Sequence, residues 1–192
     1  VGFGAAGACA ALEAHENGAD VLVPDRFHGG GTTSKSGGVY YAGGGTQIQK
    51  DAQVTDTVDD MYAYLKEETK GIVKDETLRR FCEQSVANTE WLTGHGVPFE
   101  GSLCPVKTSY PSDKYYLYYS GNESFPPYSN VAKPAPRGHR AKAKGLPGAA
   151  FYEPLRQSAE RAGVRVSYES KVTELITDAE GRVSGVAYIA LP

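Results

Sequence analysis

The first residues of the chain carry three glycines with the spacing of a phosphate-binding turn. Gly2, Gly4 and Gly7 fit the pattern Gly-x-Gly-x-x-Gly, and Ala5, Ala6 and the alanines after them favour a helix. In this pattern the first glycine permits a tight turn, the second lets the backbone approach a pyrophosphate, and the third lets the helix pack closely on a sheet. The free N–H groups at the helix start attract an anion. These five residues are therefore candidates for a dinucleotide-binding site.

The residues after the glycine run complete this fingerprint. Gly18 is expected to end the helix with a positive φ angle, and residues 21–23 predict a short apolar strand that ends at Asp25. An acidic residue about 20 positions beyond the glycines accepts hydrogen bonds from the adenosine ribose, so we assign Asp25 and Arg26 to that end of the site. The alternative is a glycine- and alanine-rich helix start with an incidental aspartate. Pro24 is unusual near the end of an interior strand because it lacks a backbone donor.

A second stretch rich in glycine and hydroxyl side chains, "FHGGGTTSKSGGVYYAGGGT", follows Arg26. An NAD(P)-binding unit does not require such a loop here, whereas the stretch resembles the second phosphate-and-flavin segment of the FAD-dependent fumarate reductase/succinate dehydrogenase flavoprotein superfamily. Its N–H groups and hydroxyls would serve a second phosphate and the flavin ring, beside which glycines let the chain run flat. A flexible loop is the alternative. The resemblance implies FAD as the cofactor, with contacts from Thr32, Thr33, Ser36, Gly37 and Gly38.

Two helices are expected in the middle of the chain. Apolar residues recur at helical spacing after Thr57, which is the expected N-cap, with Asp60 at the third helical position. A second helix is expected to have Asp75 as its cap and to end at Gly94 or Gly96. The apolar face expected on it comprises Leu78, Phe81, Cys82, Val86, Thr89 and Leu92. Neither helix carries visible chemistry.

Residues 97–146 lose all periodicity and are rich in proline, glycine, serine and tyrosine. A loop of this length inside a domain is usually functional or disordered, and its aromatic content argues against disorder. The stretch "YYLYYSGNESFPPYSNVAKPAPRGHRA", with "GVPFEGS" and "SGGVYYAGGGT", resembles bacterial 3-ketosteroid dehydrogenases, most strongly the delta-4 (5-alpha) type. The resemblance implies that this segment lies close to the cofactor.

Two sets of side chains in this segment invite a functional interpretation. One set could line an apolar substrate pocket or could simply pack as an aromatic cover: Tyr115, Tyr116, Tyr118 and Tyr119. The other set is Arg137 and His139, which suit binding of a carbonyl or carboxylate. An Arg-Gly-His run in a proline-rich segment is equally suited to pinning the loop by hydrogen bonds to carbonyl groups. Both alternatives remain open at the level of sequence.

The last third of the chain predicts a helix, a strand and a hairpin. The helix over 148–162 should end at Gly163, the strand should follow in 164–170, and the hairpin should turn at 178–181. A generic β-meander has the same order. The flavoprotein resemblance implies in addition that Val172 contacts the adenine through its backbone.

Together these features predict an α/β fold: a Rossmann-like FAD-binding domain of glutathione-reductase type with a β-hairpin or meander, truncated before the capping domain. We divide it into a dinucleotide and flavin-loop segment at 1–50, helices and an aromatic, proline-rich loop at 51–146, and a helix, strand and hairpin at 147–192. The strand before the glycine run is expected to lack its earlier residues, and the capping domain and C-terminal segment are expected to be absent. Catalytic residues are therefore expected downstream of this chain.

The reaction that the resemblance implies is dehydrogenation of a carbon–carbon bond next to a carbonyl, in a 3-ketosteroid-like ketone or enone substrate. Reduction of an activated alkene, a non-catalytic FAD-binding fragment, and an NAD(P)-binding protein are the alternatives. Scattered Lys and Arg with a net charge of −3 argue against nucleic acid. No apolar run is long enough for a membrane span, and three cysteines without a close pair indicate no metal site and a reducing, cytoplasmic setting.

Overall fold

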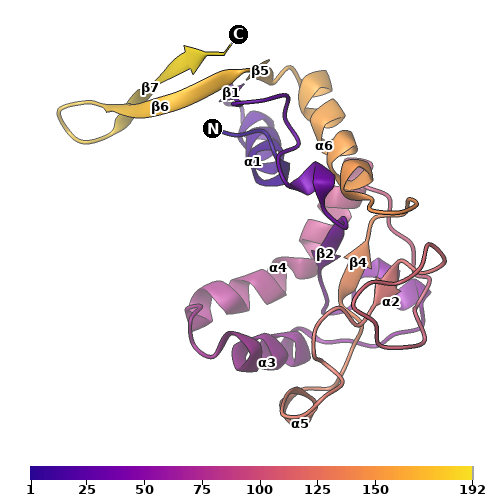
Figure 1. The fold of residues 1–192 in the computed structure, drawn as a ribbon. Coiled ribbons are helices and arrows are strands. Elements are labelled where there is room, and N and C mark those ends of the chain that lie inside the picture. Colours follow the sequence, from indigo (N-terminus) through magenta and orange to yellow (C-terminus); the bar gives the residue numbers. More distant parts are fainter. Residues whose placement is uncertain (192) are drawn as a thin grey trace.

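The computed structural model describes residues 1–191, which form a mixed α/β chain (Figure 1). The helices are α1 Ala5–Glu16, α2 Gln47–Asp51, α3 Val58–Thr69, α4 Asp75–Gly94, α5 Tyr128–Val131 and α6 Gly148–Ala162, with a 3-10 turn η1 at Thr33–Lys35. The strands are β1 Leu22–Pro24, β2 Val39–Tyr41, β3 Leu117–Tyr118, β4 Gly138–Arg140, β5 Arg165–Ser167, β6 Ser170–Thr177 and β7 Val183–Ala190.

The N-terminal residues, α1, β1 and β5 form one compact unit. Strand β1 pairs in parallel with β5, with Leu22 opposite Arg165. On the other side of β1, the Gly2 N–H donates to the Pro24 carbonyl at 2.8 Å. The expected helix and strand are thus confirmed, and Gly18 has the expected positive φ of 86°. The chain therefore returns, after α1, to lie directly beside its own first residues.

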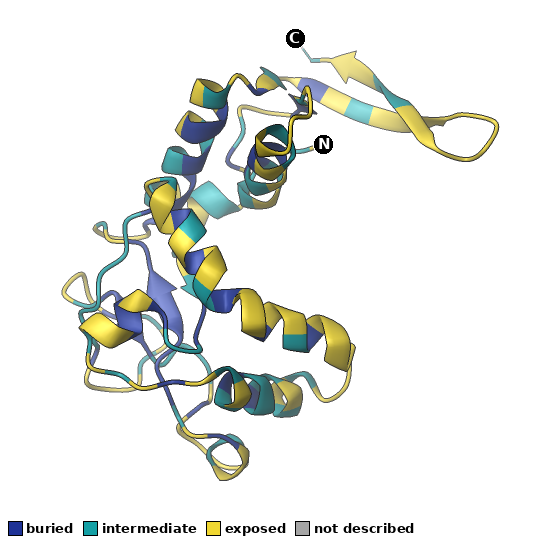
Figure 2. Cartoon of the chain, turned by 180° about the vertical axis from the view of Figure 1, so that it is seen from behind, coloured by how far each residue is buried: buried dark blue, intermediate teal, exposed yellow. Residues whose placement is uncertain are grey.

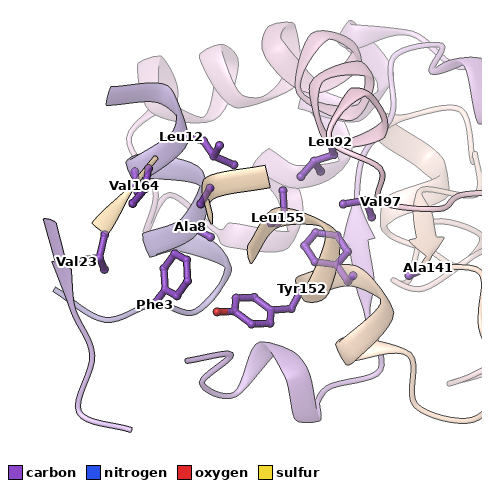
Figure 3. Close-up of a cluster of buried hydrophobic side chains, with 13 residues drawn as sticks. Phe3, Ala8, Leu12, Val23, Leu92, Val97, Ala141, Tyr152, Leu155 and Val164 are labelled. Atoms are coloured by element: carbon purple, nitrogen blue, oxygen red, sulfur yellow. The ribbon is translucent and has the colours of Figure 1, made fainter. Parts of the chain in front are cut away.

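A hydrophobic core fixes α1 and α6 against this strand pair (Figure 3). Phe3 and Leu12 pack there with Leu155 from α6, and the Phe3 ring meets Tyr152 edge-on with centroids 6.0 Å apart. The third glycine of the opening run allows the close approach of α1, because a Cβ on Gly7 would overlap the carbonyl group of Gly2. The packing role expected of this glycine is confirmed.

A second, antiparallel sheet has the strand order β2-β4-β3. Strands β3 and β4 belong to residues 97–146, which we call the irregular segment, and β2 joins them from earlier in the chain. All three residues of β4 are buried, and the strand is dark blue in Figure 2. Its two neighbours both precede it in the sequence and flank it in the sheet, because Tyr40 of β2 pairs with His139 on one side and Leu117 of β3 pairs with the same residue on the other. The sequence predicted an aromatic loop here and did not predict these strands.

Helices α3 and α4 pack side by side, and the structure confirms two of the details expected of them and contradicts two others. Thr57 caps α3 as expected, and its side chain accepts from the Asp60 N–H at 3.0 Å. The N-cap of α4 is Lys74, so Asp75 is the first helical residue and the expectation that it caps the helix was wrong. Phe81 is 36% exposed, because the buried stripe of α4 instead passes through Ser85. Helix α4 ends at Gly94 as expected.

The β6–β7 hairpin projects from the body of the molecule, as Figures 1 and 2 show. Its strands pair antiparallel and turn through residues 178–181, where the Asp178 carboxylate accepts from two backbone N–H groups of the turn. The preceding helix ends at Gly163 with φ of 94°. The helix, strand and hairpin predicted for this region are all confirmed.

Candidate functional site

A cleft of about 680 Å³ opens where the N-terminal turn, the loop after β1 and the start of β6 meet. Five of the residues assigned to a cofactor from the sequence line it: Gly2, Asp25, Arg26, Thr32 and Val172. Strand β6 reaches this place because the Ser170 N–H donates to the Asp25 carbonyl at 2.8 Å. Residues far apart in the sequence are therefore brought to one surface.

A second cleft of about 350 Å³ lies next to the first, and Thr32 lines both. Its lining is Ala5, Thr32, Thr33, Ser36, Gly38, Val39 and Phe151. The Thr33 hydroxyl accepts from the Ala5 N–H at 3.3 Å, so the hydroxyl-rich loop lies directly against the start of α1. The first-turn N–H groups of a helix have no acceptor within the helix, and this end of α1 therefore favours an anion.

Glycines face each other where the two clefts join. A Cβ on Gly31 would lie 3.8 Å from the Gly4 Cα, and a Cβ on Gly4 would lie 3.7 Å from the Gly30 carbonyl oxygen. Gly2 has φ of 83°, a conformation that side-chain-bearing residues rarely adopt. Residues without side chains therefore lie beside Thr32, the residue that lines both clefts.

The Asp25 carboxylate organises the turn around the larger cleft. It accepts from the Phe3 N–H at 2.6 Å and the Phe27 N–H at 2.7 Å, with the Gly29 N–H further away at 3.3 Å. A carboxylate offers about four acceptor positions, so three backbone bonds leave capacity for one more donor. The sequence predicted a ligand-binding role for Asp25 and did not predict this backbone role.

Four residues assigned from the sequence line neither cleft: Gly4, whose neighbours are described above, and Ala6, Gly7 and Gly37. Ala6 and Gly7 line a third hollow of about 380 Å³ between α1 and β1, and Gly2 lines both this hollow and the larger cleft. Gly37 lies against the ring of Tyr110, where a Cβ would come within 2.7 Å of Cε2. The sequence also missed several residues that line the larger cleft: His28, Ser34, Lys35, Ser170 and Lys171. Their only sequence signal is that they adjoin residues already assigned.

A buried ion pair supports the run of three glycines at residues 43–45, shortly after β2. Arg137 donates through Nε and Nη2 to both oxygens of Asp56, at 2.9 and 2.7 Å, and both side chains are fully buried. Asp56 also accepts from the Gly44 N–H at 3.0 Å and from Gln49 at 3.1 Å. Burial raises the pKa of Asp56, but the hydrogen bonds and charge of Arg137 outweigh this and hold the pKa below its usual 3.8.

His139 is buried beside this pair in a single tautomer. Its Nδ1 lies 3.0 Å from the Arg137 carbonyl, which can only accept, so Nδ1 carries the proton. Its Nε2 therefore accepts from the Thr46 hydroxyl at 2.8 Å. Burial lowers the pKa of His139 from 6.5 to about 4. Both Arg137 and His139 thus pin the chain, as one of the two sequence interpretations proposed.

We expect the stability of the chain to fall as the pH is lowered from 6.5 to 4. Unfolded His139 binds a proton below 6.5, whereas the folded residue resists protonation down to about 4, so acid favours the unfolded state. The difference between these pKa values corresponds to about 3 kcal/mol of unfolding free energy at pH 4, at 1.36 kcal/mol per pKa unit. Urea unfolding at pH 7 and pH 4 measures it.

A His139→Gln variant is the control for this pH dependence, because it cannot titrate in this range. Its unfolding free energy should change by about 3 kcal/mol less than that of the parent between the two pH values. Asp56 contributes outside this window, because its lowered pKa means that its contribution is lost only as the pH falls below 3.8. Equal pH dependence in the parent and the variant would contradict the assignment.

The tyrosines of the irregular segment pack within it. Tyr116 and Tyr118 are buried, and the Tyr116 hydroxyl donates to the Asp113 carbonyl at 2.9 Å. None of the four tyrosines considered from the sequence lines either cleft described above. Within residues 1–191, no group of three or more His, Cys, Asp or Glu side chains is placed to hold a metal ion. The described helices include none with the length and hydropathy of a membrane span.

Comparison with known proteins places this geometry in a family. The family described as "FAD binding domain" matches residues 1–190. The chain is 48% identical over 198 aligned positions to the 3-oxo-5-alpha-steroid 4-dehydrogenase of Comamonas testosteroni, an alignment that covers 100% of this chain and 37% of that protein.

Solved structures agree with this match. The 3-ketosteroid-delta4-(5alpha)-dehydrogenase of Rhodococcus jostii RHA1, in complex with 4-androstene-3,17-dione, superposes with a TM-score of 0.91 at 38% identity over 98% of this chain and 40% of that one. A flavocytochrome c3 fumarate reductase superposes with a TM-score of 0.79 at 24% identity, over 98% of this chain and 29% of that one, and this likeness shows the fold alone. The chain spans 37% and 40% of the lengths of the two steroid dehydrogenases.

Proposed function

Because this chain belongs to the FAD-binding domain family, we propose that its two joined clefts hold FAD, with the adenosine end in the larger and the flavin side in the smaller. The observation that carries the proposal is the convergence, in the larger cleft, of five cofactor residues assigned from sequence. Combined dimensions of this order suit a large ligand. The fit is supported by the glycine-lined junction and by the anion-favouring start of α1.

The chain's own residues have distinct roles in this proposal. Gly2 and Gly4 keep the path of the pyrophosphate free of side chains, next to the N–H groups at the start of α1. Asp25 has one acceptor position left for a ribose hydroxyl. Val172 is brought to the cleft by the start of β6, where its backbone would meet the adenine. Arg26 lines the same cleft and adds positive charge at its adenosine end, next to Asp25.

We also propose a topology for the cofactor-binding unit and a division of the chain into segments. We infer a Rossmann-like unit of glutathione-reductase type from the turn of residues 1–4, α1, β1 and the parallel strand β5. The division predicted from sequence follows from it: a dinucleotide and flavin-loop segment at 1–50, a supporting segment at 51–146, and a segment at 147–192 whose hairpin starts beside the adenosine end. The hydrogen bond from Ser170 to Asp25 supports this last placement.

We propose further that the protein acts as an FAD-dependent oxidoreductase on a ketosteroid-like substrate, removing two hydrogens from a carbon–carbon bond next to a carbonyl. Bound FAD would accept one of these hydrogens as a hydride, and a general base would take the other, on the carbon next to the carbonyl, as a proton. The support is the 48% identity to a 3-oxo-5-alpha-steroid 4-dehydrogenase over the whole of this chain. Residues 1–191 bind and orient the cofactor in this account, and we assign no catalytic residue among them.

The test is turnover by the FAD-loaded protein that carries this chain. Incubated with a saturated 3-oxo-5-alpha-steroid and an artificial electron acceptor, it should form the conjugated enone, which absorbs in the ultraviolet. The same preparation is assayed with fumarate and a reduced dye. Enone formation without fumarate reduction is the expected result, and turnover of fumarate alone would replace the proposal with alkene reduction.

A further inference from the structure

Three successive carbonyl groups of the flavin-loop segment are each held by a different part of the chain. The Ser36 carbonyl accepts from the Gly148 N–H at 3.0 Å, and the Gly38 carbonyl accepts from the Ala141 N–H at 2.8 Å. Between them, the Gly37 carbonyl accepts from the Tyr110 hydroxyl at 2.8 Å. The central bond is therefore the one of the three that depends on a side chain.

The Tyr110 hydroxyl is itself oriented by a buried cation. Arg140 is fully buried, and its Nε donates to the Tyr110 oxygen at 2.9 Å. The single hydroxyl proton is then left for a carbonyl, and that of Gly37 at 2.8 Å is nearer than that of Gly145 at 3.2 Å. A donor chain runs from the guanidinium through the hydroxyl to Gly37. Chains that begin at a charge are stronger than neutral pairs.

The guanidinium of Arg140 is held in place by ring contacts and by hydrogen bonds from both of its Nη atoms. Its Cζ contacts the rings of Tyr110 and Tyr116, at 4.8 and 5.2 Å from their centroids. Nη1 and Nη2 donate to the following groups: the carbonyls of Ser112, Tyr115, Ala143 and Gly145, and the carboxylate of Asp113. Arg140 thus links residues 112–115 to residues 143–145 and directs its Nε–H to the Tyr110 hydroxyl.

The ring of Tyr110 also meets Gly37 directly. A Cβ on Gly37 would lie 2.7 Å from Tyr110 Cε2, so the ring rests against the backbone at this residue. The residues on either side, Ser36 and Gly38, line the smaller cleft. Contact and hydrogen bond together set the position of the peptide that joins these two lining residues.

We propose that Tyr110, oriented by Arg140, is a positioning residue for the flavin side of the cofactor site. It fixes the Gly37 carbonyl and thereby keeps Ser36 and Gly38 at the wall of the smaller cleft. This inference rests on the proposed FAD site. It gives Tyr110 and Arg140 a role in cofactor binding without direct contact between either side chain and the flavin.

The test compares Tyr110→Phe with Tyr116→Phe. Both substitutions keep the ring over Arg140 and remove one hydroxyl bond to a carbonyl, but that of Tyr116 goes to Asp113, away from the flavin loop. We expect Tyr110→Phe to raise the Kd for FAD about tenfold and to shift the visible absorption bands of the bound flavin. Tyr116→Phe should leave both unchanged. Tyr110→Phe also removes the acceptor of the buried Arg140 Nε, so it should unfold at a lower urea concentration than Tyr116→Phe, and both variants are titrated with FAD in the absence of urea after circular dichroism has confirmed that they are folded.

Gly37→Ala provides a second route that leaves the tyrosine intact. Its Cβ would push on the Tyr110 ring, whereas Gly94→Ala adds a Cβ that meets nothing within 4 Å. We expect weaker FAD binding in the first and unchanged binding in the second. If the parent chain binds FAD and both Tyr110→Phe and Gly37→Ala bind it equally well, the positioning role is wrong and the FAD site stands. If the folded parent does not bind FAD, the proposed site itself fails.

Discussion

Replacing Gly4 with valine is expected to weaken FAD binding more than 100-fold while leaving the chain folded. A side chain at this position points toward Gly30 and Thr33, into the junction between the two clefts. A branched side chain there would occupy the space through which the pyrophosphate must pass. Such an obstruction removes the contacts with the start of α1 as well as the space, and a 100-fold loss corresponds to about 2.7 kcal/mol.

The fold should tolerate this substitution. The added Cβ would meet its nearest neighbour, the Gly30 carbonyl oxygen, at 3.7 Å, which is ordinary contact, and Gly4 has an extended backbone at φ of −85°. Gly7 differs, because a Cβ there would overlap Gly2 and force α1 off the strand. A side chain at Gly4 should therefore affect cofactor binding, whereas a side chain at Gly7 should affect folding, although both glycines belong to one sequence pattern.

Flavin fluorescence titration measures the affinity, and far-ultraviolet circular dichroism confirms the fold. Ala10→Val is the matched control, because it places the same side chain on an exposed face of α1 and costs about 0.5 kcal/mol in helix propensity. The control should bind FAD like the parent. Unaltered affinity in Gly4→Val would show that the pyrophosphate does not pass this glycine.

Asp56→Asn is expected to lower the free energy of unfolding by about 3–5 kcal/mol, the usual cost of breaking a buried ion pair. The substitution leaves the charge of Arg137 buried without a counter-ion, and one of its nitrogens, Nη1, already has no hydrogen-bond partner among residues 1–191. It also weakens the bonds to Gly44 and Gln49 that shape the loop after β2. Urea unfolding at pH 7 measures the loss.

Asp59→Asn is the control for this effect. Asp59 pairs with Arg79 at 2.6 Å, but its side chain is 82% exposed. An exposed ion pair contributes at most about 1 kcal/mol, so the same substitution should change stability little. A loss from Asp56→Asn no larger than that from Asp59→Asn would mean that the buried pair does not stabilise the fold.

The sequence predicted the elements whose cause is local. Helix α1 and strand β1 follow from glycine spacing and an apolar run, the start of α3 from the Thr57 cap, and the ends of α1 and α6 from Gly18 and Gly163. The errors in α4 arise where a local pattern does not decide the outcome. Asp75 and Phe81 fit the helix pattern, but the contacts of α4 with other elements rotate the buried stripe toward Ser85.

The support of the candidate site could not be predicted because its causes are distant in sequence. Asp56 and Arg137 are 81 residues apart, and no property of either local sequence indicates the partner. The sequence analysis did not identify Arg140 as a structural residue, because an isolated arginine is usually an exposed charge. In the structure its side chain makes more hydrogen bonds than that of the neighbouring His139. The strands of the β2-β4-β3 sheet are two or three residues long and lack measurable periodicity.

If residues 1–191 form an FAD site, titration of this chain with FAD, with NADH as competitor, should show it. Flavin fluorescence and the visible spectrum report binding. We predict saturable binding of FAD that NADH does not displace. Displacement by NADH would indicate a nicotinamide-nucleotide site instead, and a folded chain that binds no FAD would contradict the assignment of the two clefts.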